Sequence, residues 1–317
     1  MGGSDSGASR AGPSAQARAE EQERQVGRLE HDIDVAYYHW LTGSAGFAAP
    51  AELESAMLAE ARGLLDRPAD AAGLVPRVPE VITQLLGSLG DDGASAAELK
   101  AMVAQDVVLV AEVIREANSS YFSSMAPVNT IEAALMRLGQ AGLRMLLARI
   151  AFRPVIKMQK DGFASRAAPR VWQQSERCAL AASLVASGLS AGAFEAYLAG
   201  LIQNVGLIVA FRVADRLSPK GAMPRSSEFG LGMLAVGREL SAAIARHWEF
   251  PQDVCDAIAE AGEPGTAQAQ ALALGDRIAK LRLLIDADVI AEDDALVTDS
   301  LNSFQRRCLG KLENLES

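Results

Sequence analysis

The sequence predicts an all-α protein with two helical lobes, an N-terminal helical extension and a C-terminal helix. Half of the 317 residues are hydrophobic but only 5% are aromatic. The apolar share is dominated by Ala and Leu, which lose little conformational freedom on entering a helix. Apolar residues recur at helical spacing along most of the chain, and no segment of useful length alternates as a strand would. These observations favour helices packed on helices.

The chain is expected to begin with a disordered tail, residues 1–20, which is rich in Gly, Ser and Ala and lacks periodicity. A helical extension follows at 21–68. Its first helix carries an apolar stripe at helical spacing, formed by Val26, Leu29, Ile33, Tyr37, Trp40 and Leu41. The commonest reason for such a stripe is packing on the protein's own core. The stripe could instead dimerise with a second copy, giving a homodimer, or dock a receptor.

The first helical lobe of the main domain is predicted at residues 69–165. Ser95 with Glu98 has the spacing of a capping box, in which each residue satisfies a free backbone N–H at a helix start. Asn129 with Glu132 offers a similar cap pair before the next apolar run.

The second lobe is predicted at residues 166–285, and a C-terminal helix at about 294–313 falls in the last segment, 286–317. Helices of the second lobe are expected at about 171–187, 194–211, 227–247, 251–260 and 267–285. The run "YLAGLIQNVGLIVAF" (197–211) reads as one buried helix that is interrupted by Gln203 and Asn204. Buried amides are costly unless they are hydrogen-bonded, so this pair is either a satisfied structural pair or the remains of a site.

Charge and cysteine content limit the classes of partner. The net charge of −10 argues against general binding of nucleic acid or anionic membrane. No stretch reaches the roughly 18 uninterrupted apolar residues that a membrane span requires. The three cysteines, Cys178, Cys255 and Cys308, show no pair spacing. With an odd count and no secretory leader, they indicate a cytoplasmic protein.

Two enzyme classes leave weak signals. Gly188–Gly192 matches G-x-S-x-G, but the serine-hydrolase elbow needs a strand before Ser190, and an Ala-rich helical run precedes it here. A helix C-cap and loop explain the glycines equally well. His247 lies downstream, so a serine hydrolase stays a third hypothesis. The three histidines never share the i, i+4 spacing of metal ligands. We therefore predict no catalytic residue, no metal and no cofactor.

A basic strip interrupts the acidic chain. Residues 137–177 contain nine basic residues and two acidic ones. Within this strip we single out Arg144, Arg149, Arg153 and Lys157 as residues that could receive an acidic partner, a nucleotide or a phosphorylated protein. The alternative is a solvated surface, which is the usual role of a charge run.

Several segments, taken in order, resemble the HDOD family of bacterial signalling domains. They are "LVPRVPEV" from 74, "DVVLVAEVIREANSSYF" from 106, "TIEAALMRLGQAGLRMLLA" from 130, "AYLAGLIQNVGLIV" from 196, "GRELSAAIARHWEFPQDVCDAI" from 237 and "LALGDRIAK" from 272. The resemblance covers roughly residues 70–285. It implies a helical domain related to the HD and HD-GYP phosphohydrolases, a family that usually lacks their metal site.

The resemblance also interprets the two amides. It implies that Gln203-Asn204 stands where active relatives carry the His-Asp metal dyad, and that Gln174 stands at a further His position. The resemblance further implies that Asp276 alone of the metal ligands is retained. Neutral amides bind hydrolytic metals weakly, because such ions need imidazole or anionic ligands. We therefore expect Gln174, Gln203, Asn204 and Asp276 to form a degenerate pocket, structural or able to bind an uncharged or cationic small molecule.

The function that this resemblance implies is non-catalytic signal transduction through a protein partner in a bacterial pathway. The alternative is a metal-dependent HD-type phosphohydrolase that acts on cyclic nucleotides or other phosphate esters. The partner itself cannot be named from the residues.

Overall fold

The computed structural model describes residues 15–76, 96–104, 107–118, 127–157, 161–218, 221–261 and 265–313. Most of the predicted tail, residues 1–14, lies outside these ranges, as does Ser95 of the predicted capping box. The predicted domain limits, 69–285 with a lobe boundary near 165, stay a prediction.

The fold is all-α, as predicted. The helices are α1 (Ala15–Thr42), α2 (Ala51–Arg62), α3 (Pro68–Ala72), α5 (Ala96–Ala104), α6 (Val107–Ala117), α7 (Ile131–Lys157), α8 (Gly162–Ala186), α9 (Ala193–Ile202), α10 (Val205–Asp215), α11 (Ser227–His247), α12 (Gln252–Ala259), α13 (Ala267–Asp286), α14 (Ala295–Thr298) and α15 (Ser303–Gly310), with three-ten turns η1 (Gly43–Ala45) and η3 (Ser187–Leu189). Two short parallel strands, β1 (Gly46–Phe47) and β2 (Met223–Pro224), join the extension to the second lobe.

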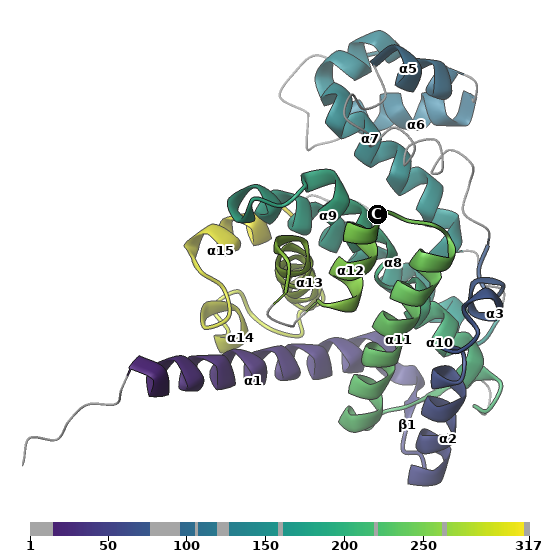
Figure 1. Ribbon diagram of the computed structural model, residues 1–317, viewed down its shortest axis with the longest axis vertical. Coiled ribbons are helices and arrows are strands. Elements are labelled where there is room, and N and C mark those ends of the chain that lie inside the picture. Colours follow the sequence, from purple (N-terminus) through teal and green to yellow (C-terminus); the bar gives the residue numbers. More distant parts are fainter. Residues whose placement is uncertain are drawn as a thin grey trace, which may run out of the picture.

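Helix α13 lies at the centre of the larger of two groups of helices, which contains α1 and α8 to α15 and which we call the larger lobe (Figure 1). It packs against α8, α9 and α12, and α1 crosses beside it and also contacts α11 (Figure 1). Helices α5 and α6 and the start of α7 pack on one another and stand apart from the rest in Figure 1. Helix α7 joins the two groups and is broken at Gly139, whose φ of 68° and ψ of 175° lie in a region that is essentially restricted to glycine.

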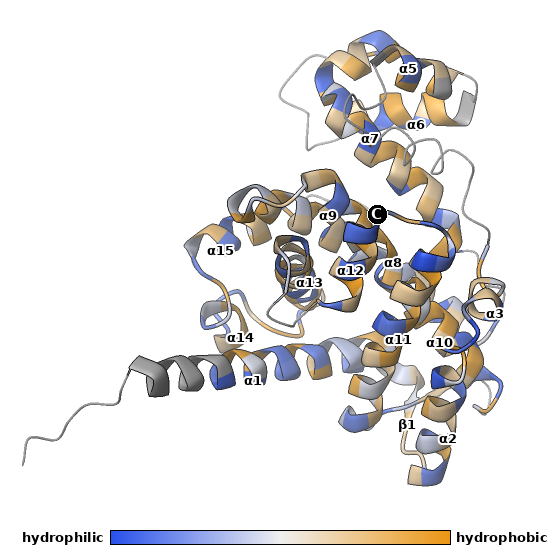
Figure 2. Cartoon of the chain, viewed as in Figure 1, coloured by the Kyte–Doolittle hydropathy of each residue, from blue (hydrophilic) through white to orange (hydrophobic). Residues whose placement is uncertain are grey.

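The apolar stripe of α1 packs on the chain's own core. Ile33, Tyr37, Tyr38 and Leu41 are buried, and the Tyr38 hydroxyl donates to the carbonyl oxygen of Pro224 at 2.7 Å. Figure 2 shows hydrophilic and hydrophobic residues mixed along this helix, as expected of a helix with one buried face. Val26, at the outer end, is 38% exposed. The stripe is therefore accounted for mainly by intramolecular packing.

Several helix boundaries differ from the predictions. Helix α1 begins at Ala15 and α8 at Gly162, both earlier than expected. Helix α7 is capped by Thr130 rather than Asn129, because the Thr130 hydroxyl accepts from the backbone N–H of Ala133. The predicted C-terminal helix is two short helices, since Asn302 forms a capping box that starts α15 afresh.

One described stretch, Ala193–Asp215, is long and apolar enough to cross a membrane by length and composition alone. It comprises α9 and α10, and 94% of its most apolar window is buried inside the protein. The stretch thus supplies core surface in this fold.

Close packing of α10 on α11 leads to a stability prediction. A Cβ at Gly206 would meet the backbone of Gly237 and Ser241, so Gly206→Ala should lower the free energy of unfolding by about 3 kcal/mol. Gly188→Ala is the control, because a Cβ there meets nothing within 4 Å, and it should change stability by less than about 0.5 kcal/mol. Urea unfolding followed by circular dichroism measures both. Equal stability of the two variants would contradict this close approach of the two helices.

Candidate functional site

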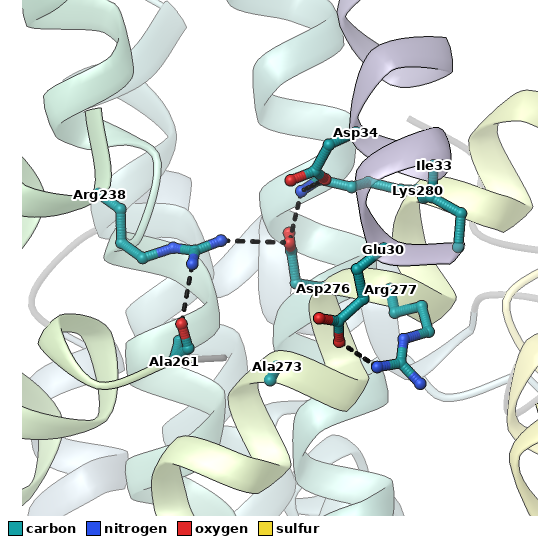
Figure 3. A pocket seen from close by; sticks show the side chains of 9 residues that line it. All are labelled: Glu30, Ile33, Asp34, Arg238, Ala261, Ala273, Asp276, Arg277 and Lys280. Atoms are coloured by element: carbon teal, nitrogen blue, oxygen red, sulfur yellow. Dashed lines mark hydrogen bonds and ion pairs between the residues drawn. The ribbon is translucent and has the colours of Figure 1, made fainter. Parts of the chain in front are cut away.

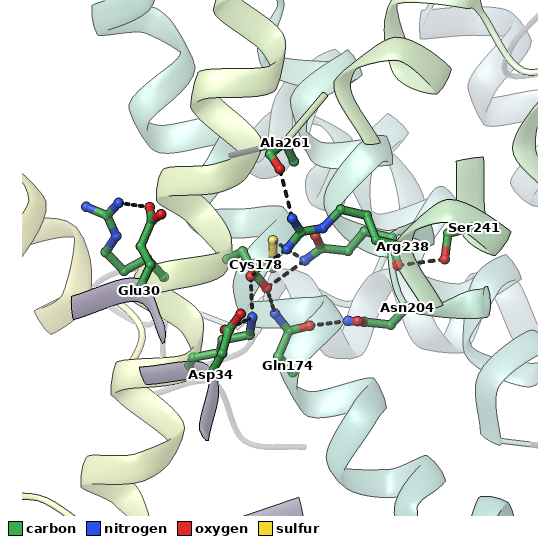
Figure 4. A network of polar contacts seen from close by, with 12 residues as sticks. Glu30, Asp34, Gln174, Cys178, Asn204, Arg238, Ser241 and Ala261 are labelled. Atoms are coloured by element: carbon green, nitrogen blue, oxygen red, sulfur yellow. Dashed lines mark hydrogen bonds and ion pairs between the residues drawn. The ribbon is translucent and has the colours of Figure 1, made fainter. Parts of the chain in front are cut away.

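The four residues of the predicted degenerate pocket lie in contact. Gln174 lies on α8, Gln203 and Asn204 form the turn between α9 and α10, and Asp276 lies on α13. The Asn204 amide donates to the Oε1 of Gln174, and the Gln174 amide donates to the Oδ1 of Asp276 (Figure 4). The Gln203 Nε2 donates to the same Oδ1 at 3.1 Å. We call these four residues the amide cluster.

The amides face inward because the chain turns there. The predicted single helix at 194–211 is in fact α9 and α10, and Ser241 of α11 holds the turn between them. The Ser241 hydroxyl lies 2.6 Å from the carbonyl oxygen of Gln203 and accepts from the backbone N–H of Gly206 at 2.8 Å. At Gly200, a Cβ would meet the backbone of Ala179, so glycine permits α9 to lie close to α8.

Both oxygens of Asp276 are engaged by donors. Its Oδ1 accepts from the amides of Gln174 and Gln203. Its Oδ2 accepts from the Lys280 ammonium at 2.6 Å, and the Arg238 guanidinium lies 3.9 Å away. This carboxylate, the retained member of the ligand set that the family resemblance implies, is thus surrounded by amide N–H groups and cationic side chains.

Asp276 also lines a pocket of about 80 Å³. We call it the charged pocket. It is lined by residues of α1, α11 and α13 and by Ala261, which follows α12, as Figure 3 shows. Its lining residues are Glu30, Ile33, Asp34, Arg238, Ala261, Ala273, Asp276, Arg277 and Lys280. The amide cluster and the charged pocket therefore share one carboxylate and form one continuous polar site.

Lys280 is the central cation of this site. Its side chain is 6% exposed, and its Nζ lies 2.6 Å from both Asp276 and Asp34. Burial disfavours the charged form, but the two carboxylates outweigh burial and raise the pKa of Lys280, so it stays an ammonium group. The ammonium also lies 5.4 Å from the centre of the Tyr37 ring. Burial, with Asp276 and Asp34 nearby, raises the pKa of Tyr37 well above its usual value.

These residues do not suit a hydrolytic metal ion. Among the described residues, no group of three or more His, Cys, Asp or Glu side chains could hold one. Cys178 accepts from Gln203 at 2.8 Å, and burial, then the charge of Asp276, raises the pKa of its thiol. The sulfur is therefore a neutral thiol and not a thiolate ligand. An ammonium beside Asp276 further opposes a second cation.

The predicted basic strip is partly used inside the protein. The Arg149 guanidinium pairs with Glu116 and lies 3.8 Å from Glu176. The Arg144 guanidinium lies 5.2 Å from the centre of the Phe194 ring. Arg153 is exposed and Lys157 is half-buried; burial, then the charge of Arg153, lowers the pKa of Lys157. A partner-binding role for the strip stays a prediction, and Arg153 is the exposed one of the four residues singled out within it.

The G-x-S-x-G match does not form a nucleophile elbow. Ser190 is exposed and adopts a left-handed conformation, with φ of 57°, between η3 and α9. Within the described ranges, the strands are β1 and β2, and neither leads into this turn. His247 is exposed at the end of α11. The sequence therefore makes a helix-to-helix connection, as its alternative interpretation as a C-cap and loop anticipated.

Sequence reasoning missed the charges around Asp276. Asp276 and Lys280 are four residues apart, a spacing that places them on one helix face, so this pair could have been found. Glu30 and Asp34 show the same spacing on α1. Their pairing with Arg277 and Lys280 joins segments 247 and 246 residues apart, for which the local pattern holds no signal.

Comparison with known protein families shows to which family this chain belongs. The HDOD domain matches residues 75–264, which is more than half of the chain. The chain belongs to the HDOD family. Both α1 and α13 lie outside the matched residues, so in this HDOD protein the charged pocket is built largely from elements beyond the family match.

Solved structures share the fold at low identity. An HDOD domain protein of unknown function from Geobacter sulfurreducens has a TM-score of 0.55 at 21% identity, covering 82% of this chain and 94% of its own. A Shewanella amazonensis structure named "Putative metal-dependent phosphohydrolase" has a TM-score of 0.54 at 18% identity, covering 83% of this chain and 100% of its own. At these identities the likeness establishes the fold alone.

A sequence relative extends beyond this chain. An uncharacterized protein of Treponema pallidum is 24% identical over 201 residues. The match covers 60% of this chain but only 38% of that protein.

Proposed function

We propose that this HDOD protein is a non-catalytic signalling protein that acts by binding a partner protein in the cytoplasm. The observation that supports this best is that both carboxylate oxygens of Asp276 already accept hydrogen bonds from side chains of the protein. Two amide groups and one ammonium engage its oxygens. A metal that activates water for phosphate-ester hydrolysis would have to displace the Lys280 ammonium and recruit ligands from neutral amides.

Metal content and turnover test the catalytic half of this proposal. The full chain is purified, incubated with Mn²⁺, Fe²⁺ or Zn²⁺, desalted and analysed for metal, then assayed with bis(p-nitrophenyl) phosphate and cyclic nucleotides. We expect neither retained metal nor turnover. Stoichiometric metal with turnover, both lost in Asp276→Asn, would overturn the proposal and favour the HD-type phosphohydrolase.

A charge reversal tests the binding half. We expect a protein captured from the native cytoplasm to be released by salt and to be lost with Arg153→Glu, because Arg153 is the exposed one of the four strip residues singled out above. Arg306→Glu on α15 is the matched control, since Arg306 is exposed but lies outside the strip. A partner whose capture and salt dependence are identical for both variants would discard the strip as its contact.

A further inference from the structure

We propose that the charged pocket binds a small phosphate-type oxyanion, either free phosphate or a phosphate monoester, between Arg238, Arg277 and Lys280. We further propose that Glu30 and Asp34 on α1 compete with that anion for the same cations. The inference deepens the proposed function, because it gives the signalling protein a small-molecule ligand. It rests on that function in one respect: the anion is bound and is not hydrolysed.

The first argument is that the α13 cations of the pocket lie deeper than the carboxylates of α1. Three lining residues are cations (Arg238, Arg277, Lys280) and three are carboxylates (Glu30, Asp34, Asp276). The α13 side chains lie deepest: Arg277 is 12% exposed and Lys280 is 6% exposed. The α1 carboxylates lie further out, with Glu30 39% and Asp34 26% exposed. Without α1, the pocket would hold three cations and one carboxylate.

The second argument is that two of these cations carry unused donors. The Arg277 Nε is buried and has no hydrogen-bond partner within the described part of the chain. Arg238 donates to the carbonyl oxygen of Ala261 at 2.8 Å, but its other terminal nitrogen lies 3.9 Å from Asp276, beyond hydrogen-bond distance. A guanidinium has five N–H donors, and an orphaned buried donor is costly.

The third argument is space and chemistry. The pocket measures about 80 Å³, and a single water needs roughly 10–15 Å³ on this scale, so there is room for a group of several atoms. Planar guanidinium groups favour oxyanions that accept two hydrogen bonds at once, and phosphate is the common biological example. The carboxylates of α1 satisfy Arg277 and Lys280 in the same way that an anion would.

Isothermal titration of the full chain with inorganic phosphate tests the proposal, with chloride at matched ionic strength as the blank. A second arm uses methyl phosphate, which separates a monoester ligand from free phosphate by relative affinity. We expect saturable binding of at least one of the two. Arg238→Gln should weaken it by about tenfold or more, because charge-assisted hydrogen bonds are lost. Glu30→Gln should tighten it severalfold, because a competing carboxylate is removed.

Arg246→Gln is the matched control, since Arg246 lies on the same helix α11, is 48% exposed on its side chain and pairs with Asp256 away from the pocket. Its phosphate affinity should equal that of the natural chain. The proposal is overturned if neither anion binds above the chloride blank, or if Arg238→Gln and Arg246→Gln lose affinity equally. Phosphate-ester turnover would refute the non-catalytic role while leaving the anion site intact, so the two failures are distinguishable.

Discussion

Lys280→Met is expected to lower the free energy of unfolding by about 3–5 kcal/mol. The Lys280 side chain is 6% exposed and its ammonium lies 2.6 Å from both Asp276 and Asp34. Methionine keeps most of the apolar stem but removes the charge, which leaves Asp276 buried beside amide donors without its nearest cation. An uncompensated buried carboxylate loses hydration that amides replace only in part. Equilibrium unfolding in urea, monitored by circular dichroism, measures the loss.

A double-mutant cycle shows whether the loss arises from the ion pair. Lys280→Met with Asp276→Asn removes both charges, so the double variant should be less destabilised than the sum of the single variants by about 0.5–3 kcal/mol. Lys311→Met, at an exposed lysine, should leave the unfolding midpoint almost unchanged. Additive losses in the cycle would show that Lys280 stabilises the protein by packing and not by its charge.

Restoring the implied metal ligands is expected to fail while Lys280 is present. Gln174→His, Gln203→His and Asn204→Asp together supply the His-Asp pattern beside Asp276. The ammonium already lies 2.6 Å from an Asp276 oxygen. Repulsion between a divalent ion and an ammonium about 4 Å away is on the order of several kcal/mol at an effective dielectric constant near 20.

Adding Lys280→Ala to the three changes should therefore strengthen Mn²⁺ or Zn²⁺ binding by about a hundredfold or more. Competition against a chromophoric chelator measures the affinity of each variant. Adding Lys311→Ala to the same three changes is the control and should not strengthen binding. Equal affinity with and without Lys280 would mean that the ammonium does not exclude the metal.

Residue patterns sufficed for the helical class and for the composition of the amide cluster. Gln203 and Asn204 could be recognised from the sequence because two adjacent amides interrupt an otherwise apolar run. The resemblance then related them to Gln174 and Asp276, and the structure brings all four together. The sequence pattern did not reveal the break between α9 and α10 at Gln203 and Asn204. An apolar run continues through it, and the tertiary contact with Ser241 holds the turn.

The charges around Asp276 could be anticipated only in part. Lys280 follows Asp276 by one helical turn, so a local rule reaches it. Asp34 and Glu30 come from the opposite end of the chain, and only the packing of α1 on α13 brings them into place. In the basic strip, too, tertiary contacts were hidden from the local pattern. A count of charges along the sequence places Arg149 in the strip, but its guanidinium pairs with Glu116 of α6 and lies near Glu176 of α8, a contact that the linear sequence does not reveal.

The central position of α13 has a practical consequence for fragment design. The HDOD match stops at residue 264, before the helix that fills the middle of the larger lobe and carries Asp276. A chain truncated at residue 264 would expose to solvent the faces of α8 and α9 that pack on α13. It would also leave the amides of Gln174 and Gln203 without Asp276 as their acceptor. The segment that the HDOD match covers is therefore smaller than the set of helices that pack around α13, and expression boundaries should be drawn outside both α1 and α13.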